Sequence, residues 1–289
     1  MITAAYDHCE ALTRRAHSNF YWGFRLLPHE RRRALSAVYA FCRAADDIAD
    51  EPGATRDPAA LLGRWREELE AVYTGRPRHP IGVALADTVE RFRIPREHFE
   101  AVIAGVEMDL TRDRYATWQE DLAPYCYGVA GAVGLIAIEI FGYQNRSARQ
   151  YALNLGFAFQ LTNILRDVAE DAQRGRVYLP QEDLQRFDCP EEDVLAGRCT
   201  DAFREVMAFE SARAGEFYGR ARFLLAEEDR QSLAPAEAMR LIYEQVLRRV
   251  TFRRYDVFGP KVRLTPPEKA GLAVAAWVRP HLSFLYRLA

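Results

Sequence analysis

The sequence predicts an all-α protein in which residues 1–289 form a single domain and one helical bundle. Apolar residues recur at helical spacing along most of the chain, whereas the alternating runs that mark β-strands are scarce. Several prolines stand at or just before the start of a helical pattern, where the missing N–H costs no hydrogen bond: Pro28, Pro58, Pro95, Pro190 and Pro235. No long flexible stretch separates these patterns, so nothing divides the chain into two domains.

Composition limits the classes of partner. Hydrophobic residues make up 49% of the chain, which is enough for a sizeable core. The formal net charge of -2 argues against nucleic acid as a partner, because no surplus of basic side chains is present to neutralise phosphates. The five cysteines are odd in number and lack metal-ligand spacing, which is typical of free thiols in a reducing compartment. The N-terminal segment has no apolar signal-peptide core, so we expect a cytoplasmic protein.

The first helical segment with a distinctive pattern is aromatic. Phe20 and Phe24 are one helical turn apart, with Tyr21 and Trp22 between them. Such rings are usually a core patch. They can also line a cavity for a long hydrocarbon, where an aromatic face stabilises a passing carbocation. The pattern alone leaves both interpretations open.

An acidic cluster follows on the next helix, within YAFCRAADDIAD at residues 39–50. Asp46 and Asp50 are four residues apart and therefore share a helix face, with Asp47 beside them. Tyr39 and Arg43 continue the same stripe toward the N-terminus. The pairing of carboxylates with an arginine one turn away, in an otherwise apolar helix, points to a site that binds a metal and a diphosphate.

The middle of the chain is less informative. Residues 57–93 are rich in Arg and Glu, as expected of an outer helix, and a further helix runs from residue 95 to 110. It carries Asp109, which forms an i,i+4 pair with Asp113. With 41 acidic residues in 289, roughly six such pairs are expected by chance, so this pair has no assigned role.

Residues 125–142 form an apolar run of the length of a membrane span. Glu139 interrupts the run, and glycines recur every three residues at Gly128, Gly131 and Gly134. A glycine face allows another backbone or a ligand to approach closely, at a cost in helix propensity. We therefore expect a buried helix beside a cavity.

The second acidic cluster lies in GFAFQLTNILRDVAEDAQRGRVYLP at residues 156–180. Asn163, Asp167 and Asp171 are spaced by four, so their side chains project from one helix face, about 6 Å apart per step. Gln160 and Arg166 lie on or beside that face. Stacked carboxylates on a buried face need a cation between them, and a set of oxygen ligands favours Mg²⁺ over zinc.

The C-terminal third supports this site. The loop 173–180, punctuated by Gly and Pro, follows the acidic face directly, and loops in such positions commonly act as lids that exclude water. Helical patterns cover residues 200–228 and 236–257, and Thr265 with Glu268 predicts a capping box that opens the last helix. The final stretch is amphipathic and broken by Pro280, which is typical of a segment that closes a cavity or contacts a membrane surface.

Several of these stretches together resemble the squalene/phytoene synthase family. They are YAFCRAADDIADE, QLTNILRDVAEDAQRGRVYLP, the SNF entry at residues 18–20 and the YCYGVAGAVG run at residues 125–134. The resemblance covers nearly the whole chain, from about Cys9 to about Lys269. Within the family, the segment SNFYWGFRLLPHERRRALSAVYAFCRAADDIADEPG is most similar to bacterial presqualene diphosphate synthases of hopanoid pathways.

The resemblance implies a bundle of the prenyl-synthase type around a central apolar cavity, and a Mg²⁺-dependent prenyl transferase that joins two farnesyl diphosphates into presqualene diphosphate. It implies metal ligands at Asp46, Asp47, Asp50, Asn163, Asp167 and Asp171. It implies substrate contacts at Ser18, Phe20, Phe24, Arg43, Gln160, Lys261 and Lys269. It assigns catalytic roles to Tyr39, Tyr127, Arg166 and Tyr243, with Tyr127 near the reacting carbons. The apolar product would pass to a membrane surface or to a downstream enzyme of the pathway.

Other products and other classes are alternatives. A complete squalene synthase would use NADPH, and a phytoene or dehydrosqualene synthase would make a different hydrocarbon, so the prenyl length of C15 or C20 is open. A terpene cyclase or chain-elongating synthase uses the same metal chemistry on one prenyl chain, but its first motif is not normally embedded in YAFCRAADDIADE. A non-catalytic assembly protein of the same fold would have no need for paired carboxylates.

Overall fold

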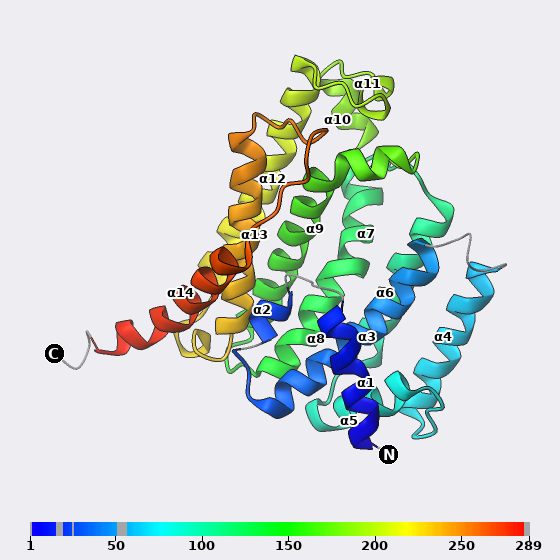
Figure 1. The fold of residues 1–289 in the computed structure, drawn as a ribbon, viewed down its shortest axis with the longest axis vertical. Helices are drawn as coiled ribbons and strands as arrows, with labels where there is room; N and C mark the ends of the chain where they lie inside the picture. The colour runs from blue at the N-terminus through cyan, green and yellow to red at the C-terminus, as the bar shows by residue number, and fades with distance from the viewer. Residues whose placement is uncertain (1, 16–19, 25, 51–56, 286–289) are drawn as a thin grey trace.

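The computed structural model describes residues 2–15, 20–24, 26–50 and 57–285. These residues form helices and connecting segments, and the β-structure among them is limited to an isolated bridge between Arg114 and Val177 (Figure 1). The prediction of an all-α bundle is therefore confirmed.

The first half of the bundle consists of α1 (Ile2–Arg15), α2 (Phe20–Phe24), α3 (His29–Asp50), α4 (Pro58–Tyr73), α5 (Pro80–Phe92) and α6 (Arg96–Thr111). An irregular helical segment follows, made of η1 (Trp118–Leu122), α7 (Ala123–Cys126), η2 (Tyr127–Gly131) and α8 (Ala132–Phe141). The second half contains α9 (Ser147–Gln173), α10 (Gln181–Arg186), α11 (Glu191–Leu195), α12 (Asp201–Leu224), η3 (Glu227–Asp229), α13 (Ala234–Phe252) and α14 (Pro266–Leu285).

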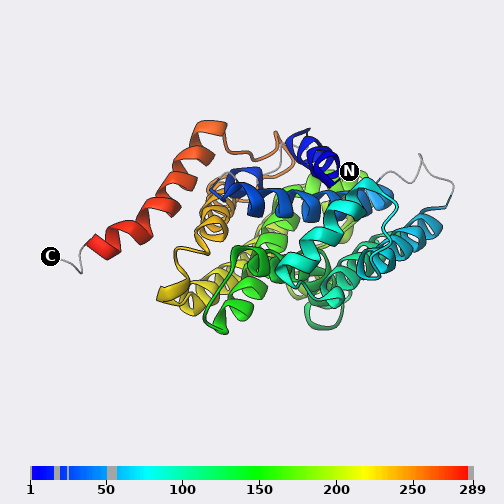
Figure 2. The ribbon, with the colours of Figure 1, turned by 90° about the horizontal axis from the view of Figure 1, so that it is seen from below.

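The helix α9 is the central element of the bundle. It packs against α8, η2, α12 and α13. The helix α3 packs against α1, α5, α6 and α8, so α8 contacts both helices (Figures 1 and 2). Of the 27 residues of α9, the buried ones recur at three- and four-residue spacing along its length, as expected for a helix surrounded by others. The two segments that carry the acidic clusters are thus both interior helices.

The glycines of the apolar run form contacts between helix backbones. A Cβ atom on Gly128 would lie 2.7 Å from the Cα of Gly105 in α6, and one on Gly156 in α9 would lie 2.7 Å from the Cα of Gly131. One on Gly134 would lie 2.8 Å from a backbone oxygen of α9. No side chain fits at these positions, so the glycine spacing fixes how closely this segment approaches α6 and α9.

The apolar segment Trp118–Phe141 is largely buried inside the bundle. By length and composition the segment Trp118–Phe141 could cross a membrane, yet 56% of its most apolar window is buried inside the bundle. Its packing against α6 and α9 agrees with the prediction of a buried helix beside a cavity.

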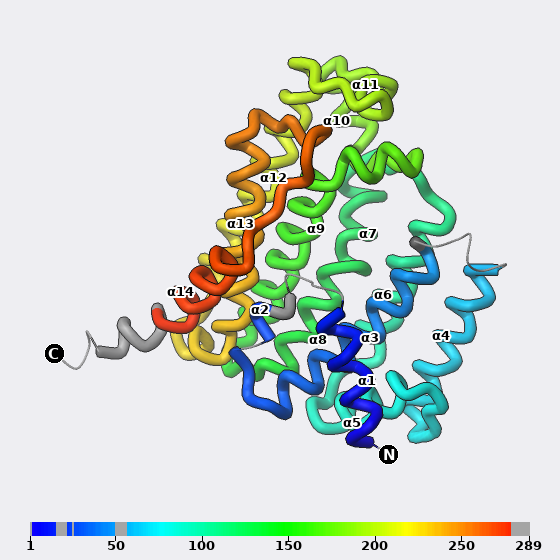
Figure 3. The backbone as a smooth tube through the Cα atoms, viewed as in Figure 1, coloured from blue at the N-terminus to red at the C-terminus, as the bar shows by residue number. Residues whose placement is uncertain are grey.

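The last helix, α14, extends away from the bundle (Figures 1 and 3). Its start is capped as the sequence predicts, because the Glu268 carboxylate accepts a hydrogen bond from the backbone N–H of Thr265 at 2.8 Å. Val274 and Trp277 on this helix are 57% and 49% exposed. One face of the helix thus packs on α13 through the buried Ala273 and Ala276, while Val274 and Trp277 lie at the surface.

A buried ion cluster connects α12 to α10. Asp183 and Glu210 are 3% and 1% exposed, and Arg213 donates hydrogen bonds to both carboxylates, with 3.0 Å to Asp183. Burial, and next the neighbouring Asp183, raise the pKa of Glu210 to about 8. One guanidinium thus faces two carboxylates, and the folded chain retains a proton on Glu210 near neutral pH.

We expect this proton to make stability depend on pH. The pKa of Glu210 rises from 4.5 to about 8 on folding. The protonated side chain therefore adds to the free energy of unfolding, fully below pH 4.5, and this addition is lost as the pH rises through 8. In the wild type the free energy of unfolding should fall between pH 4.5 and 8, and in Glu210→Gln it should fall less. Urea denaturation at several pH values measures both. Glu216→Gln, at an exposed position of the same helix, is the matched control, and equal slopes for both variants would contradict the assignment.

Candidate active site

A cavity of about 1220 Å³ lies inside the bundle and changes in character along α9. Near the C-terminal end of α9 it is bordered by Asn163, Asp167 and Asp171, and near the N-terminal end by Leu155 and Tyr151. The cavity therefore has a charged mouth and an apolar interior, both formed by one face of the same helix.

The helix α3 contributes a second wall with the same polarity. Asp46 and Arg43 border the cavity near its C-terminal end, and Val38 and Leu35 border it toward the N-terminal end. The two predicted acidic helices thus meet at one cavity, with their polar residues at corresponding ends. Asp50 is the last residue of α3, and its side chain lies outside the described part of the structure.

The predicted metal ligands on α9 differ in their hydrogen-bond and ion-pair partners. Asp167 accepts a hydrogen bond from the Nε of Arg166 at 2.7 Å and faces the Nζ of Lys261 at 2.9 Å. Burial favours the neutral acid, but these two cations outweigh it and lower the pKa of Asp167. Burial, and next the charge of Asp167, raise the pKa of Asp171 to about 7. The Oδ1 atom of Asn163 is buried without a hydrogen-bond partner.

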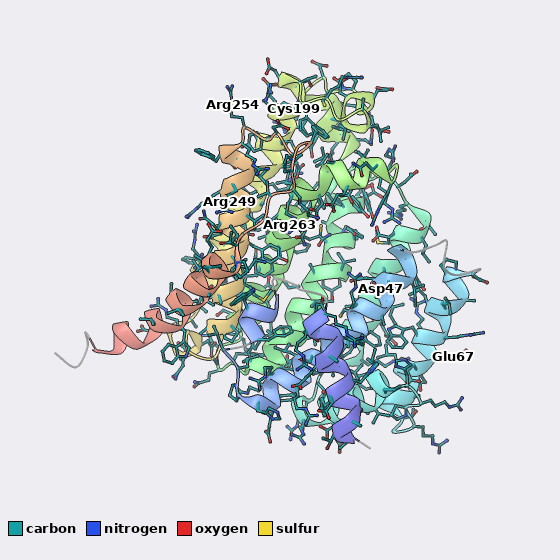
Figure 4. All side chains as sticks on the ribbon, viewed as in Figure 1. Asp47, Glu67, Cys199, Arg249, Arg254 and Arg263 are labelled. Atoms are coloured by element: carbon teal, nitrogen blue, oxygen red, sulfur yellow. The ribbon has the colours of Figure 1, made fainter. Side chains whose placement is uncertain are left out.

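Asp47 does not join this group. Its side chain is 48% exposed, it forms an ion pair with Arg43 at 2.6 Å, and it is absent from the cavity wall (Figure 4). The reason is geometric, because consecutive helical residues point about 100° apart and Asp46 is the one directed at the cavity. The structure therefore does not support the assignment of Asp47 as a metal ligand.

Tyr127 is also placed away from the cavity. It is 37% exposed, whereas Tyr125 is buried and borders the cavity. Two residues correspond to about 200° around a helix, so these two side chains point to opposite sides. The expectation that Tyr127 lies near the reacting carbons does not agree with this position.

The other predicted aromatic residues border the cavity. Tyr243 is 3% exposed and stacks on Phe159 with ring centroids 4.5 Å apart. Tyr39 contacts Phe24 edge to face at 6.4 Å. Trp22, between the predicted pair, also borders the cavity. Ser18 and the side chain of Phe20 lie outside the described residues.

Basic side chains gather at the mouth in larger number than the sequence predicted. The predicted Arg166, Lys261 and Lys269 border the cavity, as does the predicted Gln160. Burial, and next the charge of Arg166, lower the pKa of Lys269. The residues Arg174, Arg176 and Arg263 also border the mouth, and sequence analysis had not assigned them to the site (Figure 4 labels Arg263).

Asp109 is the most informative residue that the sequence analysis left without a role. It borders the cavity, and its carboxylate accepts hydrogen bonds from Tyr178 at 2.7 Å and from Tyr125 at 3.0 Å. Its backbone carbonyl accepts a hydrogen bond from Arg176 at 3.2 Å. The i,i+4 spacing with Asp113 was the available signal, but chance pairs have the same spacing.

The loop that follows α9 is fastened beside this aspartate. The backbone N–H of Val177 donates to the carbonyl of Asp113 at 2.9 Å, and that of Gln181 donates to the carbonyl of Tyr115 at 2.9 Å. The ring of Tyr178 stacks on Tyr115 at 5.5 Å and on Tyr125 at 5.3 Å, and the latter two rings also contact each other at 5.3 Å. The loop predicted to cover the site thus lies against the end of α6, with Arg174 and Arg176 at the cavity.

Comparison with known proteins agrees with the class that this fold and site define, namely enzymes that act on prenyl diphosphates. The model of the squalene/phytoene synthase family matches residues 13–268, and the chain belongs to this family. It is 40% identical to a phytoene synthase of Arthrospira platensis, over 89% of this chain and 87% of the relative. It is 38% identical to a 15-cis-phytoene synthase of Synechococcus elongatus, with the same shares covered.

Solved structures agree as well. A dehydrosqualene synthase in complex with a ligand superposes with a TM-score of 0.85 at 29% identity, over 99% of this chain and 98% of that one. The squalene synthase HpnC from Alicyclobacillus acidocaldarius gives 0.80 at 30% identity, over 88% and 96%. The predicted family and prenyl-synthase fold are confirmed. The chain is a prenyltransferase-type enzyme of isoprenoid biosynthesis, and these relatives do not single out the hopanoid-pathway enzymes.

We expect Asp109→Ala to destabilise the protein, because it leaves two buried tyrosine hydroxyls without their acceptor. The loss in the free energy of unfolding should be about 2 kcal/mol in urea denaturation. Asp113→Ala, whose carboxylate is 75% exposed, should change it by less than about 0.5 kcal/mol. Equal losses for the two variants would show that the tyrosine contacts of Asp109 contribute nothing.

Proposed function

We propose that this enzyme catalyses the Mg²⁺-dependent head-to-head condensation of two farnesyl diphosphates to presqualene diphosphate. The observation that carries the proposal is the cavity itself, in which two acidic helices meet at a charged mouth above an apolar interior. Diphosphates suit the mouth, and prenyl chains suit the interior.

The size of the cavity supports two substrates. Its volume of about 1220 Å³ exceeds the roughly 300–1,000 Å³ of ordinary small-molecule pockets. A single prenyl chain would leave much of this space to water. Two chains side by side would fill it, and a reactive intermediate would then be protected from water.

The residues at the mouth fit a magnesium ion. The buried Oδ1 of Asn163 has no hydrogen-bond partner, and Asp171 is a buried carboxyl beside a second carboxylate. Among the described residues, no three His, Cys, Asp or Glu side chains form a ready metal cage. Mg²⁺ does not require such a cage, because it is usually held by one or two carboxylates, several waters and the phosphates of a substrate.

Asn163, Asp167, Asp171 and Asp46 would hold such ions, together with Asp50 as the sequence predicts. When bound, Mg²⁺ would neutralise the donor diphosphate and make it a better leaving group. Arg166, Lys261 and Lys269 are placed to hold diphosphate oxygens by charge-assisted hydrogen bonds.

The reaction needs no redox partner. The C1–O bond of the donor breaks, and the diphosphate leaves with the bonding electron pair. The C2–C3 double bond of the second substrate attacks the resulting allylic cation, and loss of a proton from C1 of the donor closes a cyclopropane. The released diphosphate would accept that proton. Two farnesyl diphosphates thus give presqualene diphosphate, diphosphate and a proton.

Aromatic rings and the exclusion of water would protect the allylic cation. The stacked pair of Phe159 and Tyr243 and the edge-to-face pair of Phe24 and Tyr39 border the cavity. Their π-faces can attract an allylic cation. The apolar wall around them offers no water to quench it.

A second candidate product is phytoene, which the names of the sequence relatives favour. It would require the same condensation of two C20 substrates, followed by loss of the second diphosphate, rearrangement of the cation and loss of a further proton, without hydride. A complete squalene synthase is a third candidate, and it would require hydride from NADPH. The sequence has no G-x-G-x-x-G motif after a strand, although reductants can be bound without one.

Product analysis tests the proposal. Purified protein with Mg²⁺ and farnesyl diphosphate should give presqualene diphosphate, identified after phosphatase treatment, whether or not NADPH is present. A chelator should abolish turnover and Mg²⁺ should restore it. Squalene formed only with NADPH would assign a complete squalene synthase. A C40 product formed from geranylgeranyl diphosphate in a parallel assay would assign a phytoene synthase, and full activity in excess chelator would refute the role of the metal.

Substitution of the carboxylates tests the site. Asp46→Ala and Asp167→Ala should each lower turnover by at least about 10²-fold, because charge stabilisation of a leaving group is worth several kcal/mol. Their helical circular dichroism should stay that of the wild type. Asp47→Ala, on the same helix but outside the cavity wall, is the matched control and should retain most of the activity. A loss for Asp47→Ala as large as that for Asp46→Ala would contradict the arrangement described above.

A further inference from the structure

A buried tyrosine borders the end of the cavity opposite the mouth. Tyr151 is 0% exposed and lines the cavity one helical turn before Leu155. It precedes Asn163 by 12 residues on α9, so the two lie about 18 Å apart along the helix axis. The same helix therefore carries both the diphosphate end of the site and its far wall.

Residues of three neighbouring helices complete the apolar end of the cavity. On α3, α8 and α13, the lining residues farthest from the charged mouth are Leu35, Phe141 and Ala236. All three are buried, and Ala236 is next to the residue that binds the Tyr151 hydroxyl. Buried side chains from four helices thus line the far end of the cavity.

The ring of Tyr151 is fixed at this position by an ion network. Its hydroxyl donates to the Glu237 carboxylate at 2.9 Å, and the Nη2 of Arg240 donates to the same carboxylate at 2.7 Å. Arg240 is 4% exposed and also donates to Glu244 at 2.9 Å. If the ring swung away, a buried carboxylate would lose a donor and hydrocarbon would face a buried ion pair, and both changes are unfavourable.

A fixed wall is what selection for a short prenyl chain requires. Each additional buried methylene strengthens binding, so an open apolar cavity would prefer the longer of two prenyl chains. A geranylgeranyl chain has four isoprene units and a farnesyl chain has three. Over the axial distance of about 18 Å between Asn163 and Tyr151, we expect an extended farnesyl chain to end before the ring and a fourth isoprene unit to meet it.

We propose that Tyr151 is the specificity-determining residue that limits each substrate to a C15 prenyl chain. The inference rests on the proposed head-to-head condensation and names the substrate length for it. Glu237 and Arg240 act as positioning residues, because they hold the Tyr151 ring and do not border the cavity.

The test compares two substrates and several variants. For each protein, kcat/KM is measured with farnesyl and with geranylgeranyl diphosphate in the presence of Mg²⁺. The wild type should favour farnesyl diphosphate. Tyr151→Ala should raise the ratio of geranylgeranyl to farnesyl kcat/KM by at least about 10-fold, the usual effect of a change in pocket size. Tyr151→Phe keeps the ring but removes its hydrogen bond to Glu237, so it should change the ratio by less than Tyr151→Ala does.

A matched control separates this effect from general loosening. Phe203 is a 0% exposed aromatic residue of α12 that packs on Phe258 and does not border the cavity. Phe203→Ala should lower the melting temperature without changing the substrate ratio. An equal change of ratio in Phe203→Ala would refute the role of Tyr151. If Tyr151→Ala does not fold, Tyr151→Val provides the same comparison with a smaller loss of packing.

A binding measurement keeps the inference separate from the proposed reaction. The rise in melting temperature caused by farnesyl and geranylgeranyl thiodiphosphates is measured for wild type and for Tyr151→Ala. The wild type should gain more from the farnesyl analogue, and the variant should lose that preference, even if turnover fails. A wild type that prefers the geranylgeranyl chain, or a variant with the same preference as wild type, would refute the inference and leave the condensation itself intact.

Discussion

The arrangement of the site depends on the ion contacts of Asp167 inside the bundle. Burying a carboxylate on an interior helix costs desolvation free energy. Here the Nε of Arg166 and the Nζ of Lys261 offset this cost, because they lie 2.7 and 2.9 Å from the Asp167 carboxylate. Lys261 belongs to the segment between α13 and α14, so this contact also holds the C-terminal part of the chain over the mouth. The same cations that stabilise the buried aspartate are the ones that we propose bind a diphosphate.

Close backbone packing is what allows α9 to carry this charge and still form a rigid wall. Gly156 lies in the middle of α9, between the acidic face and Tyr151, and Gly131 meets it without intervening side chains. Such a contact fixes the distance between the two helices, because neither can move closer and any separation opens a void. A cavity whose walls are fixed in this way can discriminate by length, which a loosely packed cavity cannot.

The sequence predicted those features that depend on local periodicity. The spacing of Asn163, Asp167 and Asp171 places them on one face whatever the helix packs against, and that prediction needs no tertiary information. The choice between Asp46 and Asp47 depends on which face of α3 turns inward, and no spacing rule decides it. Asp109 could not be distinguished from a chance pair, because its partners Tyr125 and Tyr178 come from distant segments that only the fold brings together.

The two ends of the cavity differ in whether their polar groups are satisfied. At the far end, the Tyr151 hydroxyl, Glu237 and Arg240 bind one another, and the network needs nothing more. At the mouth, the buried oxygen of Asn163 has no partner, and Asp171 adds a carboxyl whose pKa is raised. Buried polar groups are normally paired, so the mouth is the end that gains most from a bound cation and its anionic ligand. In the proposed reaction this asymmetry would direct the diphosphates to the unsatisfied end and the tails of the prenyl chains to the satisfied one.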